Sequence, residues 1–241
     1  SLIDALRLAR LAVLPAGDAT KRHDASHRAN LESTLARLAE LFSSHGLVEK
    51  SAPLLKELVA LQNQTAVDIL GAENTARLMD GRAATGSPTG SSCTALCADG
   101  ASRQPTASAD TCRQRCTKAL VDLARTLLQL AEMEHKKGSL LESERIFSRS
   151  IELLVQLVSG ADRRHGALCG APPLARYSPC GIQHALAKAY KLAGSFYSDR
   201  GMWSTAVLRY RSSIKHERQV RGDSQEVATS LGDTAMVYLN M

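Results

Sequence analysis

Near its C-terminal end the chain combines small, aromatic and apolar residues at a spacing that predicts two packed helices. Tyr190 and Tyr197 lie one helical turn on either side of Ala193 and Gly194. Because Ala and Gly have almost no side chain, a second helix can approach closely between the two tyrosines. Gly201 permits the positive φ that ends a helix and turns the chain back. An apolar stripe at helical spacing then follows in the returning helix: Trp203, Ala206, Val207 and Tyr210.

The same order of helix, glycine and helix occurs twice earlier in the chain. The turn glycines of these copies are Gly46 and Gly138, and Glu134 occupies the position that Phe42 and Tyr197 hold in the other two copies. One such unit cannot bury its own apolar face, so we expect neighbouring units to stack on it. The core positions of the two earlier first helices, and of a last helix near residue 240, are Leu35, Leu38, Ala39 and Phe42; Leu127, Leu130 and Ala131; and Leu231, Ala235 and Tyr238.

The periodicity predicts a chain that is helical almost throughout. The predicted helices cover residues 2–14, 28–45, 48–70, 114–137, 140–159, 183–200, 202–221 and 225–240. The first of them is interpreted as the second helix of a truncated unit. Because the sequence starts at Ser1 and both ends lie inside helical patterns, we expect 1–241 to be one solenoid taken from a longer array.

Two segments interrupt the helical pattern. Residues 72–111 are rich in Gly, Ser, Thr, Ala and Pro and contain almost no aliphatic side chains. Such a composition buries too little apolar surface to offset the entropy of ordering, so a disordered insertion is predicted. Residues 160–181 contain three prolines and are predicted to form a loop insertion. Insertions of this kind are tolerated between the units of a solenoid.

The spacing aromatic-x2-small-Gly-x2-aromatic, followed by a turn glycine and an Ala-x3-Tyr helix, resembles the tetratricopeptide repeat. Residues 46–59 resemble the second helix of kinesin light chain repeats, and residues 227–238 resemble their first helix. The resemblance implies an all-α, right-handed α-solenoid of about three full units with partial units at both ends. It also implies a protein–protein interaction adaptor or scaffold rather than an enzyme.

In the family, the first helices line a concave groove that holds an extended peptide of a partner protein. The resemblance therefore implies these peptide-binding residues: Ser33, Arg37 and Glu40; Arg125, Gln129 and Glu132; and Lys188, Lys191 and Ser195. Some members clamp a terminal carboxylate with Lys, Arg and Asn, but the matching asparagines are missing here. We expect a partner segment that contains acidic residues, because Lys188 and Lys191 lie one turn apart on the same side of their helix.

Composition and charge narrow the possible functions only slightly. Aromatic residues make up 4% of the chain, which favours a helical core of Leu and Ala over a β-sandwich. No apolar run reaches the roughly 20 residues of a membrane span, and no signal peptide is visible, so a cytoplasmic location is predicted. Residues 184–222 contain eight Lys or Arg and two acidic residues, which accounts for the net charge of +6. This excess leaves nucleic-acid binding open as a less favoured alternative to a solvated helix face.

The sequence offers no catalytic constellation, and no cofactor or metal is expected. Cys93 and Cys97, and then Cys112 and Cys116, form two C-x3-C pairs. Zinc binding and disulfides remain open for them, with reduced thiols favoured because no secretory signal is visible. The seven histidines are scattered and are interpreted as surface residues. A further alternative is that these repeats are attached to a catalytic domain outside the 241 residues.

Overall fold

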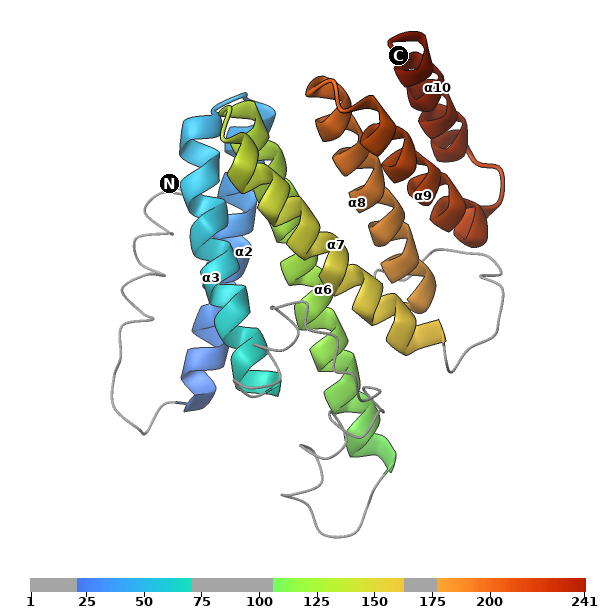
Figure 1. Cartoon of the computed structure of the whole chain (residues 1–241). Coiled ribbons are helices and arrows are strands. Elements are labelled where there is room, and N and C mark those ends of the chain that lie inside the picture. The colour runs from blue at the N-terminus through green and yellow to red at the C-terminus, as the bar shows by residue number, and fades with distance from the viewer. Residues whose placement is uncertain (1–20, 71–105, 163–176) are drawn as a thin grey trace.

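The computed structural model describes residues 21–70, 106–162 and 177–241, and these parts of the chain are α-helical without any strand. Figure 1 shows the helices following one another across the molecule in chain order. Their bounds are α2 (Lys21–Ser44), α3 (Val48–Leu70), α6 (Thr106–Lys136), α7 (Leu140–Asp162), α8 (Pro179–Asp199), α9 (Trp203–Arg221) and α10 (Gln225–Leu239). The prediction of an all-α protein is therefore confirmed for the described residues.

Six of these helices form three hairpins, each with a first and a second helix: α2–α3, α6–α7 and α8–α9. Each helix packs against the next one along the chain, including α3 against α6, α7 against α8 and α9 against α10. The first helices also touch one another, since α6 contacts α8 and α8 contacts α10. The larger of two apolar core clusters runs through all three hairpins, from Leu35 on α2 to Val237 on α10. The smaller one joins Ala66 and Leu70 on α3 to Cys116 and Leu120 on α6.

The three hairpin turns have the same backbone geometry. Gly46, Gly138 and Gly201 have φ values of 70°, 82° and 68°, as the sequence predicts for the residue that ends each first helix. In each turn the amide of the next residue donates to a carbonyl five residues earlier, with N···O distances of 2.8, 2.9 and 2.9 Å. This pairing is the Schellman arrangement that satisfies the last carbonyl groups of a helix. The repeat of sequence is thus a repeat of local structure.

Small residues occupy equivalent positions on the two helices of each hairpin. The small residue of the first helix lies seven residues before the turn glycine, and its counterpart on the second helix lies five residues after it. In the first two hairpins this counterpart is a buried serine: Ser51 Oγ donates to the carbonyl oxygen of Ala39 at 3.1 Å, and Ser143 Oγ donates to that of Ala131 at 2.8 Å. In the third hairpin the position is taken by Ala206, which is fully buried.

Several predicted boundaries need correction. α6 begins at Thr106, inside the predicted insertion 72–111 and ahead of the predicted start at residue 114. α7 continues to Asp162 and α8 begins at Pro179, so the predicted insertion 160–181 was also too wide. Residues 106–111 contain no proline or glycine, so nothing in them prevents the helix from extending beyond its apolar face. The predicted helix 2–14 and residues 72–105 and 163–176 lie outside the described residues.

Candidate functional site

The predicted groove residues of α8 lie outside the fully buried positions of that helix. Lys188 and Ser195 are exposed and Lys191 is half-buried, whereas Ala193 and Gly194 are buried. These three polar residues are spaced three and four apart, so they share one face of α8. We call the face of α6, α8 and α10 that contains Glu132, Lys188, Lys191, Ser195 and Asp233 the first-helix face.

An ion pair joins α8 to α10 on the first-helix face. The Lys191 ammonium group lies 3.6 Å from a carboxylate oxygen of Asp233, and both side chains are about one-third exposed, at 32% and 39%. Asp233 was not among the predicted residues. The residues around Asp233 in the sequence do not indicate this ion pair. Its partner is 42 residues away and is brought near only by the packing of α8 beside α10.

A buried phenol borders the same ion pair. Tyr210 on α9 is buried, and its hydroxyl forms a hydrogen bond with the side chain of Ser195. Burial raises the pKa of Tyr210 to about 12, and the nearby carboxylates of Asp233 and Asp199 add to the increase while the bond to Ser195 opposes it. Tyr210 therefore stays protonated at physiological pH and presents a hydrogen-bonding group beneath Ser195 and Asp233.

A second charged contact joins α6 to α8. Glu132 is half-buried on α6, and burial raises the pKa of its carboxyl group although the ammonium groups of Lys136 and Lys188 favour the ionised form. Glu132 and Lys188 are thus electrostatic neighbours across two successive first helices. Of the other predicted residues on α6, Gln129 is exposed and Arg125 is half-buried.

The predicted groove residues of α2 stand apart from these contacts. Ser33, Arg37 and Glu40 are exposed. Within the described residues, Arg37 and Glu40 take part in none of the ion pairs that connect the helices. The structure thus brings together Glu132 with Lys188, and Lys191 with Asp233, but it does not join the α2 residues to either pair.

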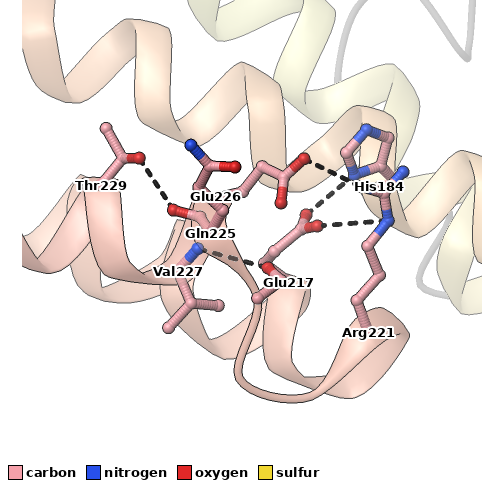
Figure 2. Close-up of polar contacts among 8 residues, drawn as sticks. His184, Glu217, Arg221, Gln225, Glu226, Val227 and Thr229 are labelled. Carbon is pink, nitrogen blue, oxygen red and sulfur yellow. Dashed lines mark hydrogen bonds and ion pairs between the residues drawn. The ribbon is translucent and has the colours of Figure 1, made fainter.

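Another polar cluster, shown in Figure 2, connects the N-terminal part of α8, the C-terminal part of α9 and the N-terminal turn of α10. Glu217 on α9 is 4% exposed, and its carboxylate accepts from His184 Nδ1 on α8 at 2.8 Å. The other oxygen of Glu217 lies 3.7 Å from Arg221 Nε, and Arg221 Nη1 bonds to Glu226 on α10 at 2.9 Å. Ser224 caps α10 by accepting from the amide of Val227. We call His184, Glu217, Arg221 and Glu226 the three-helix cluster.

The three-helix cluster contradicts the interpretation of His184 as a plain surface residue, because the ring is engaged by a buried carboxylate. A signal for it exists in the sequence: Glu217 follows Tyr210 and Ile214 on the apolar stripe of α9, and a carboxylate at a core position requires a partner. The pKa of Glu226 is lowered by a hydrogen bond from its own backbone amide and by the charges of Arg221 and His184, although burial acts in the opposite direction. The arrangement connects three helices through one buried carboxylate.

Glu134 is accommodated in the second hairpin by an ion pair instead of an aromatic contact. It is 3% exposed, and its carboxylate lies 2.8 Å from the Lys56 ammonium group on α3. Burial would raise the pKa of Glu134, but hydrogen bonds from Lys56 and Ser139 and the positive charges of Lys56 and Lys137 outweigh it, so the pKa is lowered. The residue therefore links the second hairpin to the first.

The described residues were also compared with what a metal site or a ligand pocket requires. No three His, Cys, Asp or Glu side chains among them are grouped so that they could hold a metal ion. An open depression at the α8–α9 turn is lined by Gly201, Met202, Trp203, Ser204, Thr205 and Met241. Cys180, at the start of α8, is disulfide-bonded.

No protein-family model and no curated protein matches this sequence. In the described part of the chain, every helix is too short or too polar to cross a lipid bilayer.

Proposed function

We propose that this chain is a protein–protein interaction adaptor built as an α-solenoid of tetratricopeptide-type hairpins of the kinesin light chain-like subtype. Its first-helix face binds an extended segment of a partner protein that contains an acidic residue. The observation that supports this proposal is the continuous polar row across three successive first helices. Glu132 on α6 neighbours Lys188 on α8, and Lys191 on α8 pairs with Asp233 on α10.

Lys188 is the residue that we expect to contact the acidic group of the partner. It is exposed and acts electrostatically on Glu132, whose raised pKa reflects the cost of keeping a charge half-buried. Lys191, by contrast, is already paired with Asp233. An incoming carboxylate would therefore pair with Lys188. The exposed Gln129 side chain could then bond to the peptide backbone, and the Ser195 hydroxyl could do so beside its bond to Tyr210.

Charge on the first-helix face should affect encounter and orientation more than total affinity. Exposed ion pairs are each worth little in water and weaken with salt, so most of the affinity must come from apolar and backbone contacts of the peptide. The adaptor function requires no catalytic group, and a cytoplasmic setting is the one in which we propose it acts.

The test uses the partner recovered by affinity capture and mass spectrometry, with binding measured by calorimetry. We expect Lys188→Glu to weaken binding about tenfold and to reduce its dependence on salt. A Lys191→Met variant should have a smaller effect, because this substitution leaves Lys188 in place.

The matched control reverses two charges on the second helices, Arg145→Glu on α7 and Lys215→Glu on α9, both of which are exposed. We expect this control to bind normally. If the control loses binding while Lys188→Glu retains it, the partner contacts the second helices and the proposal is wrong. Tight binding of unrelated single-stranded nucleic acid, with a steep salt dependence that both variants reduce, would instead favour a nucleic-acid function.

A further inference from the structure

Ser139 lies in the turn between α6 and α7, among side chains that the fold leaves at the surface. Every residue from Lys136 to Glu142 is exposed. Two of them are large and apolar, and the core uses little of either, since Leu140 is 38% exposed and Leu141 is 81% exposed. The side chains of this turn are therefore accessible to another molecule.

The residues on either side of Ser139 form a recognisable chemical pattern. Lys136 and Lys137 stand three and two positions before the hydroxyl group, and Leu140 follows it directly. Ser139 is the one Ser or Thr of the 241-residue sequence with Lys or Arg at both of those positions. Protein kinases that prefer basic substrates select such an acceptor, because acidic side chains of the kinase pair with the two cations while an apolar pocket holds the residue that follows.

The turn can open locally to reach a kinase. Two backbone hydrogen bonds close it, donated by the amides of Gly138 and Ser139, and each is 2.9 Å long. The Lys137 ammonium group also lies 3.5 Å from a carboxylate oxygen of Glu49, but the Glu49 side chain is 84% exposed and such a pair is weak in water. Because these residues bury little surface, opening the turn costs far less than unfolding the protein.

We infer that Ser139 is a phosphorylation site for a Ser/Thr protein kinase that selects basic substrates, and that the phosphate loosens the contact between the first two hairpins through Glu134. The kinase transfers the γ-phosphoryl group of Mg²⁺-bound ATP. A bond forms between Ser139 Oγ and the γ-phosphorus, the bond from that phosphorus to the β,γ-bridging oxygen breaks, and ADP leaves. The hydroxyl proton passes to the catalytic carboxylate of the kinase. This modification does not depend on the function proposed above.

The phosphate would act directly on a buried carboxylate. The Ser139 hydroxyl group forms a hydrogen bond with Glu134, which is 3% exposed and also lies 2.8 Å from the Lys56 ammonium group on α3. Esterification removes the hydroxyl donor and places about two negative charges beside Glu134. Lys56 and Lys137 then have two anions to neutralise, and the phosphate carries the larger charge. A buried carboxylate with weakened partners destabilises its surroundings, so the link from α6 to α3 loosens.

α7 itself should remain intact. Ser139 directly precedes this helix, and its carbonyl oxygen accepts from the amide of Ser143 at 3.0 Å. An anion at the N-terminus of a helix is stabilised by the free amides and by the helix dipole. The loosening is therefore expected in the first half of α3 and the last turn of α6, and not in α7.

The probe is the catalytic subunit of cAMP-dependent protein kinase, added with Mg²⁺ and ATP to the full 241-residue chain, and the modified residue is identified by mass spectrometry. We expect Ser139 to be modified about tenfold faster than Ser224, which has Arg221 three positions before it but no cation two positions before it. Replacing both lysines, Lys136→Ala with Lys137→Ala, should slow the modification of Ser139 about tenfold and leave Ser224 unchanged.

Hydrogen exchange measured by mass spectrometry then compares the phosphorylated chain with the unmodified one. We expect exchange about tenfold faster in the first half of α3 and the last turn of α6, with no change in α8, α9 and α10. Glu134→Gln is the matched variant. Its neutral side chain is not repelled by the phosphate, so phosphorylation should accelerate exchange in α3 much less than it does in the unsubstituted chain.

Three outcomes would overturn the inference. Ser139 is not modified, or it is modified equally fast after both lysines are replaced, which would mean that the pattern of cations does not direct the kinase. Alternatively, phosphorylation changes the exchange of α3 equally in the unsubstituted chain and in Glu134→Gln, which would mean that the phosphate does not act through Glu134. None of these outcomes affects the Lys188 experiment, which concerns the first-helix face.

Discussion

The backbone of Gly194 lies so close to the ring of Tyr210 that a Cβ atom on residue 194 would be 2.8 Å from the ring carbon Cδ1. Any side chain at this position therefore has to push α9 away from α8 or rotate a buried ring. We expect Gly194→Ala to destabilise the protein, and Gly194→Leu to do so by about 3 kcal/mol or more, as overpacking does in other cores. Thermal and urea denaturation followed by circular dichroism would measure both effects.

A second helical glycine provides the control for this prediction. A Cβ atom added to Gly232 on α10 would meet nothing within 4 Å. Gly232→Ala should therefore be neutral or stabilise by up to about 1 kcal/mol, because alanine is the better helix former. An equal change of stability in the two alanine variants would show that the contact with Tyr210 is not responsible.

The buried serines that face this seam in the other hairpins should each contribute little. Ser143 Oγ donates to the carbonyl oxygen of Ala131, and that carbonyl also belongs to the α6 helix. We expect Ser143→Ala to cost about 1 kcal/mol. The hydroxyl bond is lost, but the carbonyl group of Ala131 is not left without a hydrogen-bond partner, because it belongs to the α6 helix. The reverse change in the third hairpin, Ala206→Ser, should be close to neutral because its hydroxyl can reach the carbonyl of Gly194 in the same way. Urea denaturation would measure both, and a large loss from Ala206→Ser would show that the third hairpin is too tightly packed for this bond.

The parts of the fold that could be predicted from the sequence are those encoded within one hairpin. Gly46, Gly138 and Gly201 end their helices because only glycine adopts a positive φ cheaply, and the small residue seven positions earlier determines where the next helix approaches. Both signals are local. The start of α6 at Thr106 was missed because polar residues at a helix end have no periodicity to mark them.

The ion pairs and hydrogen bonds of the candidate sites depend on packing between helices that are far apart in the sequence. Lys191 and Asp233 are far apart in the sequence and so are His184 and Glu217, and no spacing rule connects them. Lys188 and Lys191 were predicted as a matched pair, yet Asp233 neutralises one of them and leaves the other exposed. Helical periodicity places a residue on a face, but it does not reveal which charge the neighbouring helix presents there.

Glu134 should stabilise the fold in a pH-dependent way. Its pKa in the folded protein is lowered below the ordinary value of 4.5, so its contribution is present above that value and is lost as the pH falls through the lowered pKa. We expect Glu134→Gln to destabilise the protein by about 1–3 kcal/mol near pH 7, with the difference shrinking below pH 4.5. Melting temperatures measured from pH 7 to pH 3 would test this, and a difference independent of pH would assign the effect to packing alone.

Glu132, only two residues away, should behave in the opposite sense. Burial raises its pKa in the folded protein above 4.5, so the favourable protonated state is fully present below that value and its contribution is lost as the pH rises through the raised pKa. Glu132→Gln should therefore increase the melting temperature at pH 7 and have little effect near pH 4. If the variant is instead less stable at pH 7, the attraction of Lys188 and Lys136 outweighs burial.

The three-helix cluster should control how firmly α10 is attached. Glu217 connects to His184 on α8 directly and to Glu226 on α10 through Arg221, so its carboxylate is the common partner of the other two helices. We expect Glu217→Ala to cost about 1–3 kcal/mol, less than the loss of a fully buried pair, because His184 and Arg221 remain partly accessible to water.

The loss of stability caused by Glu217→Ala should also differ between helices, since local stability follows local contacts. Hydrogen exchange measured by mass spectrometry is expected to accelerate in α10 and in the last turn of α9, with little change in α6 and α7. The control is Glu152→Gln on α7, which removes an equal charge from an exposed position. Faster exchange spread evenly over all helices would mean that Glu217 supports the core as a whole, and unchanged exchange in α10 would mean that Val227, Val237 and the rest of its buried side hold it without the cluster.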